Sequence, residues 1–343
     1  MEQYDARDHL QNVLCTISTE ELNQYLQKSR EIRMGNFAKK IHFYTPSFMY
    51  YSTKGHCNPT TDFPTISVTG QGCALNCKHC GGKVLKTMYS APTAEELLQT
   101  CTSLKNKGAS GCLISGGCLP DGSIPLQKFI DAIKRVKAKL DFTVIVHTGL
   151  LDLNTAQKLK DANVDAALID IVGSSETIRE ICRLDATVKA YEGSLQALSQ
   201  ARIPFVPHVI VGLHYGKLKG ELHALEMIAR HSPSAIVIIA FMPIHGTEME
   251  TVSPPKPVDV AKVIAAARMM FPRTPIALGC MRPKGKHRIE TDILAIRAGV
   301  NGIAFPTDEA IEFAEELGYK TIFSPLCCSQ IYAHIQSSGQ TSE

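Results

Sequence analysis

Three cysteines lie close together in the run Cys73-x3-Cys77-x2-Cys80 of this 343-residue chain. Cysteine thiolates ligate cubane iron–sulfur clusters, so these three can hold three irons of a [4Fe–4S] cluster. The fourth iron then has no protein ligand nearby and stays open to an external molecule. A zinc knuckle is the alternative, but it would need a fourth Cys or His at similar spacing. Because His79 lies between two ligand cysteines, we expect its side chain to point away from the metal.

The run resembles the signature of the radical S-adenosylmethionine (SAM) enzymes, in which the methionine part of SAM chelates the open iron. His79 occupies the position before the third cysteine, which is usually aromatic in that family and whose backbone lies near the adenine. The resemblance implies that an electron from the cluster cleaves SAM to methionine and a 5′-deoxyadenosyl radical, which then removes hydrogen from an unactivated carbon. The protein's part in such chemistry is to bind, to orient and to exclude water.

Composition narrows the class of protein. Hydrophobic residues make up 44% of the chain, enough for a large core, and no apolar run reaches the length of a membrane span. The net charge of +3 is too small to imply a nucleic-acid partner. The charged N-terminus MEQYDARDHLQ lacks the apolar region of a signal peptide, and twelve cysteines without an export signal argue against disulfides. We expect a cytoplasmic iron–sulfur protein that binds neither nucleic acid nor membranes.

Short apolar runs alternate with segments of helical period, a pattern typical of a parallel sheet built from βαβ units. The expected strands are Thr65–Thr69, Cys112–Ser115, Phe142–His147, Ala166–Ile171, Pro204–Val211, Ala235–Phe241, Pro275–Cys280 and Gly302–Phe305. The expected helices are Thr93–Lys107, Pro125–Leu140, Asn154–Ala162, Val188–Ala201, Leu218–His231, Val258–Phe271, Arg288–Ala298 and Asp308–Leu317.

Eight repeats of strand and helix predict an α/β fold, a closed (β/α)8 TIM-type barrel, with a doubly wound sheet as the alternative. The barrel is expected over residues 63–324. Residues 1–62 form an N-terminal extension, helical from Tyr4 to about Arg33 and then irregular, and residues 325–343 form a short C-terminal tail with cysteines.

The cysteine triad follows the first strand and therefore lies at the C-terminal face, where barrel enzymes keep their chemistry. The stretch Ser115-Gly116-Gly117 ends the second strand and resembles the family's "GG" element, whose backbone binds the amino group of SAM. Asp170 lies where related enzymes place a carboxylate that binds the ribose hydroxyls. The run ending at Gly212 resembles the apolar stretch that packs the adenine, although a plain core strand explains it almost as well.

Within the superfamily the chain resembles biotin synthase-like proteins, through IALGCMRPKGKHRIETDILAIRAGVNGIAFP among other stretches. Biotin synthase holds a second cluster through strand-borne cysteines and an arginine, yet His147 and His208 stand on the third and fifth strands here. The stretches PTISVTG, LGCMRP and SPLCCSQ resemble the two-component (split) lipoyl synthases, each of which carries a second [4Fe–4S] cluster. The resemblance implies such an auxiliary cluster here, and its candidate ligands are Cys280, Cys327, Cys328 and Cys118, with Ser329 and Cys57 as further candidates.

Several residues have simpler interpretations. Cys15, Cys101 and Cys182 sit in helical patterns, and Cys112 begins a strand, so all four are expected to be buried hydrophobes. His147, His208 and His214 can line the site or be hydrogen-bonded structurally. Arg282 can be a ligand, a carboxylate clamp or a surface residue. The basic run Arg282–Arg288 can contact SAM or an acidic carrier domain.

The resemblance implies sulfur insertion into an octanoyl or mercaptooctanoyl chain on a lysine of a lipoyl-carrier protein. The auxiliary cluster would supply the sulfide, a homologous subunit would share the work, and a ferredoxin or flavodoxin would donate the electron. Two alternatives stay open: another radical SAM reaction, such as biotin-type sulfur insertion or a carbon-skeleton rearrangement, and a non-catalytic iron–sulfur protein.

Overall fold

A computed structural model describes residues 18–58 and 61–339 of the chain. At its centre lies a sheet of 11 strands in the spatial order β11-β1-β10-β9-β8-β7-β6-β5-β4-β2-β3, and all neighbouring strands are parallel. The strands are β1 (Lys40–Tyr44), β2 (Thr65–Ser67), β3 (Tyr89–Ser90), β4 (Gly111–Ser115), β5 (Thr143–His147), β6 (Ala166–Asp170), β7 (Phe205–Val211), β8 (Ile236–Ala240), β9 (Ile276–Leu278), β10 (Gly302–Ala304) and β11 (Lys320–Ser324).

The α-helices are α2 (Thr19–Asn36), α3 (Ala94–Asn106), α4 (Ile130–Leu140), α5 (Leu153–Asp161), α6 (Ser175–Glu180), α7 (Val188–Gln200), α8 (Glu221–Ala229), α9 (Pro257–Met270), α10 (Lys286–Arg297), α11 (Asp308–Glu316) and α12 (Ile331–Gly339). Short 3-10 helices lie at η1 (Lys83–Thr87), η2 (Leu126–Phe129) and η3 (Cys328–Gln330). Some helix starts are encoded locally: Thr93 and Glu96 each accept a hydrogen bond from the other's backbone N–H, which fixes the start of α3.

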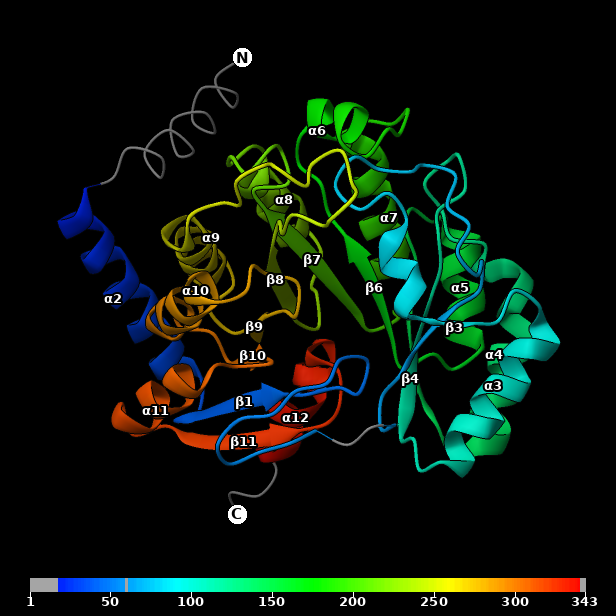
Figure 1. The fold of residues 1–343 in the computed structure, drawn as a ribbon, viewed down its shortest axis with the longest axis horizontal. Coiled ribbons are helices and arrows are strands. Elements are labelled where there is room, and N and C mark those ends of the chain that lie inside the picture. Colours follow the sequence, from blue (N-terminus) through cyan, green and yellow to red (C-terminus); the bar gives the residue numbers. More distant parts are fainter. Residues whose placement is uncertain (1–17, 59–60, 340–343) are drawn as a thin grey trace.

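The eight expected strands are all present, as β2 and β4 to β10, and the eight expected helices follow them in turn. These strands lie side by side in chain order, without the reversal that defines a doubly wound sheet, so that alternative is wrong. Figure 1 shows the helices around the outside of the curled sheet. The predicted α/β, TIM-type barrel class is confirmed. Within the expected N-terminal helix, the part before residue 18 lies outside the described residues.

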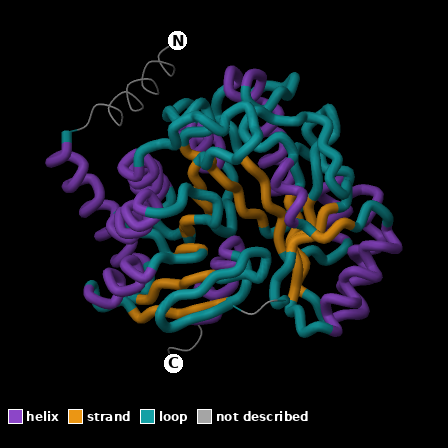
Figure 2. Tube along the Cα trace, viewed as in Figure 1, coloured by secondary structure: helices purple, strands orange, loops and turns teal. Residues whose placement is uncertain are grey.

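The sheet is open, whereas the sequence predicted a closed barrel. Closure would require β2 to pair with β10, but β1 occupies that edge of β10, and β11 pairs with the other side of β1. At the opposite end β2 pairs with β3. Figure 2 shows these two ends of the curled sheet. A strand from the segment expected to be irregular therefore completes one edge of the sheet.

Two apolar cores cover the two faces of the sheet. The larger core lies between the strands and the outer helices. The smaller core contains the inward-facing side chains of neighbouring strands together with residues of the C-terminal segment. Its strand members include Ile145, Leu168, Val206 and Val237, and its C-terminal members are Cys327, Cys328 and Ile331.

The C-terminal segment is held inside the curled sheet by polar contacts as well as by apolar packing. η3 contacts β8, β9 and β10. The Tyr332 hydroxyl donates to the Asp165 carbonyl at 2.8 Å, and the Tyr44 hydroxyl lies 3.0 Å from Nδ1 of His334. The segment that looked like a short tail in the sequence therefore fills the concave face.

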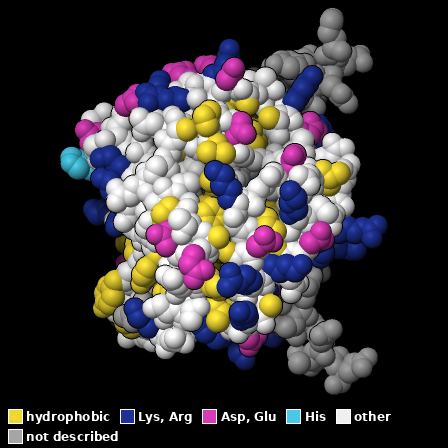
Figure 3. Space-filling model, turned by 90° about the vertical axis from the view of Figure 1, so that its right-hand side faces the viewer, with side chains coloured by type: hydrophobic (Ala, Val, Ile, Leu, Met, Phe, Trp, Pro, Cys, Tyr) yellow, Lys and Arg dark blue, Asp and Glu magenta, His cyan; other side chains and the backbone are white. Residues whose placement is uncertain are grey.

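On the face of the molecule that carries α3 and α4, basic and acidic side chains are interspersed and form no patch of one charge (Figure 3). Among the described residues, no helix combines the length and the apolar character that crossing a membrane requires.

Arg282 is fully buried, so it is not a surface residue. It is also not available to bind the carboxylate of a ligand, because its donors are used within the protein. Its Nε and Nη2 donate to the two carboxylate oxygens of Asp292 at 2.7 and 3.0 Å. Its remaining donors bond the carbonyls of Gly279, Ala304 and Phe305. With its donors satisfied inside the protein, Arg282 ties the end of β9 to the end of β10 and to α10.

Replacing Asp292 with Asn should therefore destabilise the fold by about 3–5 kcal/mol, because it leaves a buried guanidinium without its counter-charge. Urea unfolding of the cluster-free protein would measure this change. The matched control is Glu312→Gln, which breaks the exposed pair with Lys54 and should leave the unfolding midpoint nearly unchanged, because solvent screens such a pair. Equal midpoints for the two variants would contradict the structural role of Arg282.

Candidate functional site

The cysteine loop follows β2 at the carboxyl end of the sheet and is anchored against the end of β4. The Gly117 N–H donates to the Thr69 hydroxyl at 2.7 Å, and the Ala74 N–H donates to the Cys118 carbonyl at 2.8 Å. A Cβ on Gly117 would lie 2.0 Å from the Gly72 carbonyl oxygen and 2.6 Å from Cα of Cys73. Only glycine permits this approach, so the Gly116-Gly117 pair sets the position of the cysteine loop.

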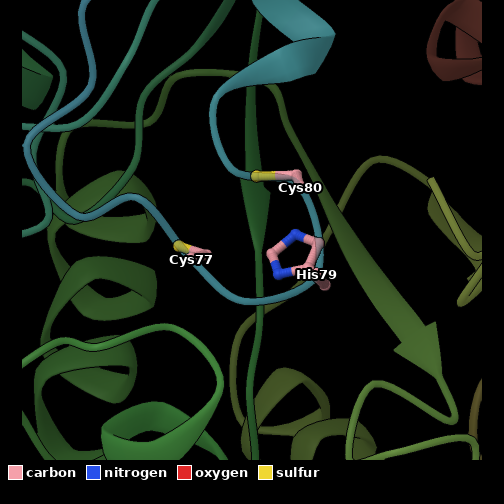
Figure 4. Close-up of side chains that lie close together, drawn as sticks. All are labelled: Cys77, His79 and Cys80. Atoms are coloured by element: carbon pink, nitrogen blue, oxygen red, sulfur yellow. The ribbon is translucent and has the colours of Figure 1, made fainter. Parts of the chain in front are cut away.

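Side chains of the loop converge on one small region. The ligand atoms of Cys77, His79 and Cys80 all lie within 4.8 Å of one another. Figure 4 shows the His79 ring beside the Cys77 and Cys80 side chains, so it does not point away from this group as the sequence predicted. Its Nδ1 is buried and has no hydrogen-bond partner among the described residues. The loop bends at Asn76, which has a positive φ, and this turn brings the three side chains together.

Cys73 completes the triad from the start of the loop, where it meets Cys118. A hydrogen bond from the Cys118 thiol lowers the pKa of Cys73 to about 5, which favours the thiolate that binds iron. The sequence had assigned Cys118 to a second cluster, but the structure places its thiol beside the first one. The reason is that Cys118 directly follows Gly117, whose backbone touches the cysteine loop.

The loop has further support that the sequence analysis missed. The Lys78 ammonium donates to the Tyr215 hydroxyl at 2.8 Å, and that hydroxyl donates to Glu180 at 2.6 Å. From another side, Arg183 donates to the Asn76 carbonyl at 3.0 Å. No local sequence signal pairs these residues, because they come from loops that only the barrel topology brings together.

These features fit a [4Fe–4S] cluster. The donor set is three thiols on one loop, one of them poised as a thiolate, and a buried imidazole nitrogen beside them has no partner within the described chain. The three sulfurs need not touch, because each thiolate of a cubane holds a different iron. Cys73, Cys77 and Cys80 would hold the cluster, which in the radical SAM enzymes that the cysteine run resembles supplies the electron that cleaves SAM.

Inward-facing polar side chains lie on the neighbouring strands β5, β6 and β7. His147 Nε2 lies 3.5 Å from Asp170 Oδ1, and Ser329 Oγ lies 3.4 Å from His208 Nε2. Burial is the largest influence on the pKa of Asp170 and would raise it, but His147, His208 and His79 together outweigh burial and lower that pKa to about 2. Burial lowers the pKa of His208 to about 4, so this imidazole is neutral at physiological pH.

A small pocket lies beside the ends of β6 and β7, lined by Gly173, Leu213 and Glu221 among others. The Glu221 carboxylate accepts hydrogen bonds from the N–H groups of Gly212 and Lys219, at 2.8 and 2.6 Å. Burial raises the pKa of Glu221 to about 7. The expected adenine-packing stretch ends at Gly212, directly at this pocket, and Glu221 is a buried carboxylate that the sequence analysis missed.

The tail cysteines lie inside the curled sheet, near the end of β9. A hydrogen bond with Cys328 lowers the pKa of Cys327 to about 7. Burial first, and the charge of Cys327 next, raise the pKa of Cys280 to about 11. The Ser329 hydroxyl accepts a weak hydrogen bond from the Cys327 thiol at 3.6 Å. The structure thus brings Cys280, Cys327 and Cys328 into one neighbourhood.

Most of the other candidates fall outside these groups. Cys101 and Cys112 are buried, and Cys57 is exposed in the loop before β2. Cys182 is buried too, but its carbonyl accepts a hydrogen bond from the Cys77 thiol at 3.2 Å, so it lies against the cysteine loop. Cys15 lies outside the described residues. His214 is hydrogen-bonded to the Thr177 hydroxyl at 3.2 Å.

Comparison with known proteins agrees with this geometry. Residues 67–219 match the model of the radical SAM superfamily. Biotin synthase of Hyphomonas neptunium is 26% identical over 249 residues, which cover 69% of this chain and 75% of that protein. The 3-methylornithine synthase of Methanosarcina barkeri is 22% identical over 316 residues, covering 91% of this chain and 83% of that protein.

Two solved structures share the fold. A crystal structure of methylornithine synthase superposes with a TM-score of 0.64 at 17% identity and covers 96% of each chain. A maturase of the [FeFe]-hydrogenase, HydG, gives a TM-score of 0.65 at 18% identity, covering 94% of this chain and 72% of that one.

Residues 67–219 thus resemble the radical SAM superfamily, and the chain is similar to biotin synthases and methylornithine synthases. Members of that superfamily use a [4Fe–4S] cluster and SAM, and the cysteine loop after β2 carries thiols that fit such a cluster. The closer resemblance to split lipoyl synthases stays a prediction.

Replacing Cys73, Cys77 and Cys80 together with Ala should abolish reductive SAM cleavage, because no thiolate would remain on the loop to hold the cluster. Chromatographic detection of 5′-deoxyadenosine after anaerobic reconstitution would measure this loss. The circular dichroism spectrum should stay that of the unchanged protein. Continued production of 5′-deoxyadenosine would show that another site cleaves SAM.

Gly117→Ala should lower SAM cleavage by about 100-fold although Gly117 is not a ligand, because the added methyl displaces the Cys73 backbone by roughly an ångström. The control is Gly193→Ala in α7, where a Cβ meets no atom within 4 Å. That change should leave cleavage unaltered and stabilise the helix by about 0.5–1 kcal/mol. Full activity in Gly117→Ala would contradict the positioning role of the glycine.

Proposed function

We propose that this protein inserts sulfur into a protein-bound octanoyl or mercaptooctanoyl chain during the biosynthesis of the lipoyl cofactor. The observation that carries this proposal is the grouping of Cys280, Cys327 and Cys328 inside the curled sheet, apart from the cysteine loop. A reaction that adds sulfur needs a sulfur source, and a second [4Fe–4S] cluster on these thiols would provide one.

The chemistry of the tail supports a cluster site. Thiolates are the ligands that iron–sulfur clusters require, and Cys327 has a pKa of about 7, low enough to be largely deprotonated in mildly basic solution. Ser329 adds an oxygen ligand next to Cys327 in space. Arg282, the counterpart of the biotin synthase arginine in the resemblance, is occupied by Asp292 and backbone carbonyls, so it is not part of this ligand set.

The proposed partners follow from the substrate. An octanoyl-lysine on a lipoyl-carrier protein must enter the barrel from outside, and carrier domains are commonly acidic. Two lysines are exposed at the carboxyl end of the sheet: Lys284, in the segment between β9 and α10, and Lys286, the first residue of α10. Arg288 is half-buried and donates to the Arg282 carbonyl at 3.3 Å. The proposed docking surface for the carrier therefore consists of Lys284 and Lys286. A homologous partner subunit and a ferredoxin or flavodoxin complete the proposed system.

A carbon-skeleton rearrangement without sulfur is the second candidate. The observation that favours it is the match with methylornithine synthase along almost the whole chain, in sequence and in fold. Biotin-type sulfur insertion is a further form of the sulfur chemistry, supported by the biotin synthase homologues. The rearrangement needs one cluster, whereas both sulfur insertions need a sulfur source.

Iron content and isotope transfer separate these functions. The reconstituted protein should hold about eight irons, and the variant without Cys73, Cys77 and Cys80 should keep about four. When the clusters are built with heavy-isotope sulfide, an octanoyl-lysyl peptide incubated with SAM, reductant and the homologous subunit should gain heavy sulfur, measured by mass spectrometry. Cys280→Ala with Cys328→Ala should still cleave SAM but transfer no sulfur. A total of four irons, or conversion of dethiobiotin to biotin, would contradict the proposal.

Reversing the charge of the two exposed lysines, with Lys284→Glu and Lys286→Glu together, should slow turnover on an intact acidic carrier more than on a short octanoyl-lysyl peptide. The difference should shrink at high salt, because screening weakens electrostatic steering. The matched control reverses two exposed lysines of α5, Lys158→Glu with Lys160→Glu, and should leave both rates unchanged. Equal losses on carrier and peptide would remove the support for docking at Lys284 and Lys286.

A further inference from the structure

Two histidines and one aspartate form a compact group that the cysteine loop does not use. His147 ends β5, Asp170 ends β6 and His208 lies within β7, so three adjacent strands each contribute one side chain. The ligand atoms of all three lie within 4.8 Å of one another. Asp170 and His208 are also direct register partners in the parallel pairing of β6 with β7. The pairing of the strands therefore fixes the positions of the Cα atoms that carry these side chains.

The tautomer of His208 favours a role as a metal ligand. His208 Nδ1 lies 3.1 Å from the carbonyl of Val206, which can accept its proton. That bond leaves the lone pair on Nε2, the nitrogen that faces the group. Metal-binding histidines commonly donate their second N–H to a backbone carbonyl in this way.

His147 and Asp170 form an ion pair whose separation is also close to that between two ligands of one ion. Nε2 and Oδ1 are 3.5 Å apart, longer than the roughly 2.7–2.9 Å of a charge-assisted bond. Two ligands at about 2.1 Å from one metal lie roughly 3–3.4 Å apart when they subtend angles near 90–110°. The two side chains keep 23% and 39% of their surface accessible, so an ion can reach both.

We propose that His147, Asp170 and His208 bind one divalent first-row transition ion, such as Fe(II) or Co(II), inside the curled sheet. Two imidazoles and one carboxylate are the ligand set of mononuclear sites that leave coordination positions open. This site is distinct from the cysteine loop, and it does not depend on the proposed sulfur insertion.

The surroundings suit such a site. Ser329 Oγ lies 3.4 Å from His208 Nε2, so the C-terminal segment presents a hydroxyl to the open side of the group. Apolar inner-face residues such as Leu168 and Val206 neighbour the group and limit access of water. A carboxylate has two oxygens with about four lone pairs, so Asp170 can bind an ion and still accept a ribose hydroxyl.

A comparison within the chain shows why this group stands out. Glu176, Glu180 and His214 also bring ligand atoms within 4.8 Å of one another, but they lie near the surface. There each has a partner: Lys219 for Glu176, Tyr215 for Glu180 and Thr177 for His214. In that surface group the Lys219 ammonium already pairs with the Glu176 carboxylate, and its positive charge opposes the binding of a metal cation there.

Cobalt binding to the full-length chain with Cys73, Cys77 and Cys80 replaced by Ala tests the proposal without the SAM cluster. We expect one Co(II) per chain, followed by its visible absorption under anaerobic conditions. His147→Gln, Asp170→Asn and His208→Gln should each weaken binding by about 100-fold or more, since even loss of a supporting partner costs about 10–100-fold. The control His214→Gln should leave the affinity within about twofold, because its ring belongs to the surface group.

A second measurement needs no further substitution and so does not depend on whether the variants fold. X-ray absorption at the cobalt edge of the loaded protein should show two imidazole nitrogens and carboxylate oxygen at about 2.0–2.2 Å. A first shell made of sulfur would overturn the proposal, as would a shell with fewer than two imidazoles. Unchanged affinity in folded His147→Gln and His208→Gln, or loss of affinity in His214→Gln, would also overturn it.

Discussion

A parallel sheet must bury both of its faces, and the rest of this structure depends on how that requirement is met. The outer face is covered by helices α3 to α11, each of which follows its strand. The inner face of an open, curled sheet has no such cover of its own. Here the C-terminal segment from Cys327 to Ile331 lies against β8, β9 and β10 and closes the inner core. One short segment therefore supplies both apolar packing and reactive side chains.

The same requirement determines where chemistry is possible. Because all strands are parallel, their carboxyl ends meet at one edge, and the cysteine loop, the Gly116-Gly117 pair and Asp170 come from three of those ends. The close approach of Gly117 to Cys73 links the first two through backbone alone. The position of the cluster loop is thus set by a steric contact, to which side-chain bonds such as Lys78 to Tyr215 add support.

The C-terminal segment connects the proposed sites. Its Ser329 hydroxyl faces His208, and its Cys327 and Cys328 face Cys280. Movement of this segment would change the ligand environment of the tail thiols and the open side of the His147, Asp170 and His208 group together. Hydrogen bonds tie α12 to Tyr44 of β1 and to the carbonyl of Asp165, which directly precedes β6.

The sequence by itself determined the repeating order of strands and helices, because apolar runs and helical periods are local patterns. It also determined the cysteine triad, because three ligands within one loop need no tertiary structure to be adjacent. Only the tertiary structure showed that β1 keeps the sheet open, that Cys118 meets Cys73 and that Arg282 is buried against Asp292. The grouping of His147 with Asp170 and His208 likewise appeared only in the fold. These contacts join residues from different strands and loops, and their register and side-chain directions are set by pairing and packing across the whole sheet rather than by neighbours along the chain.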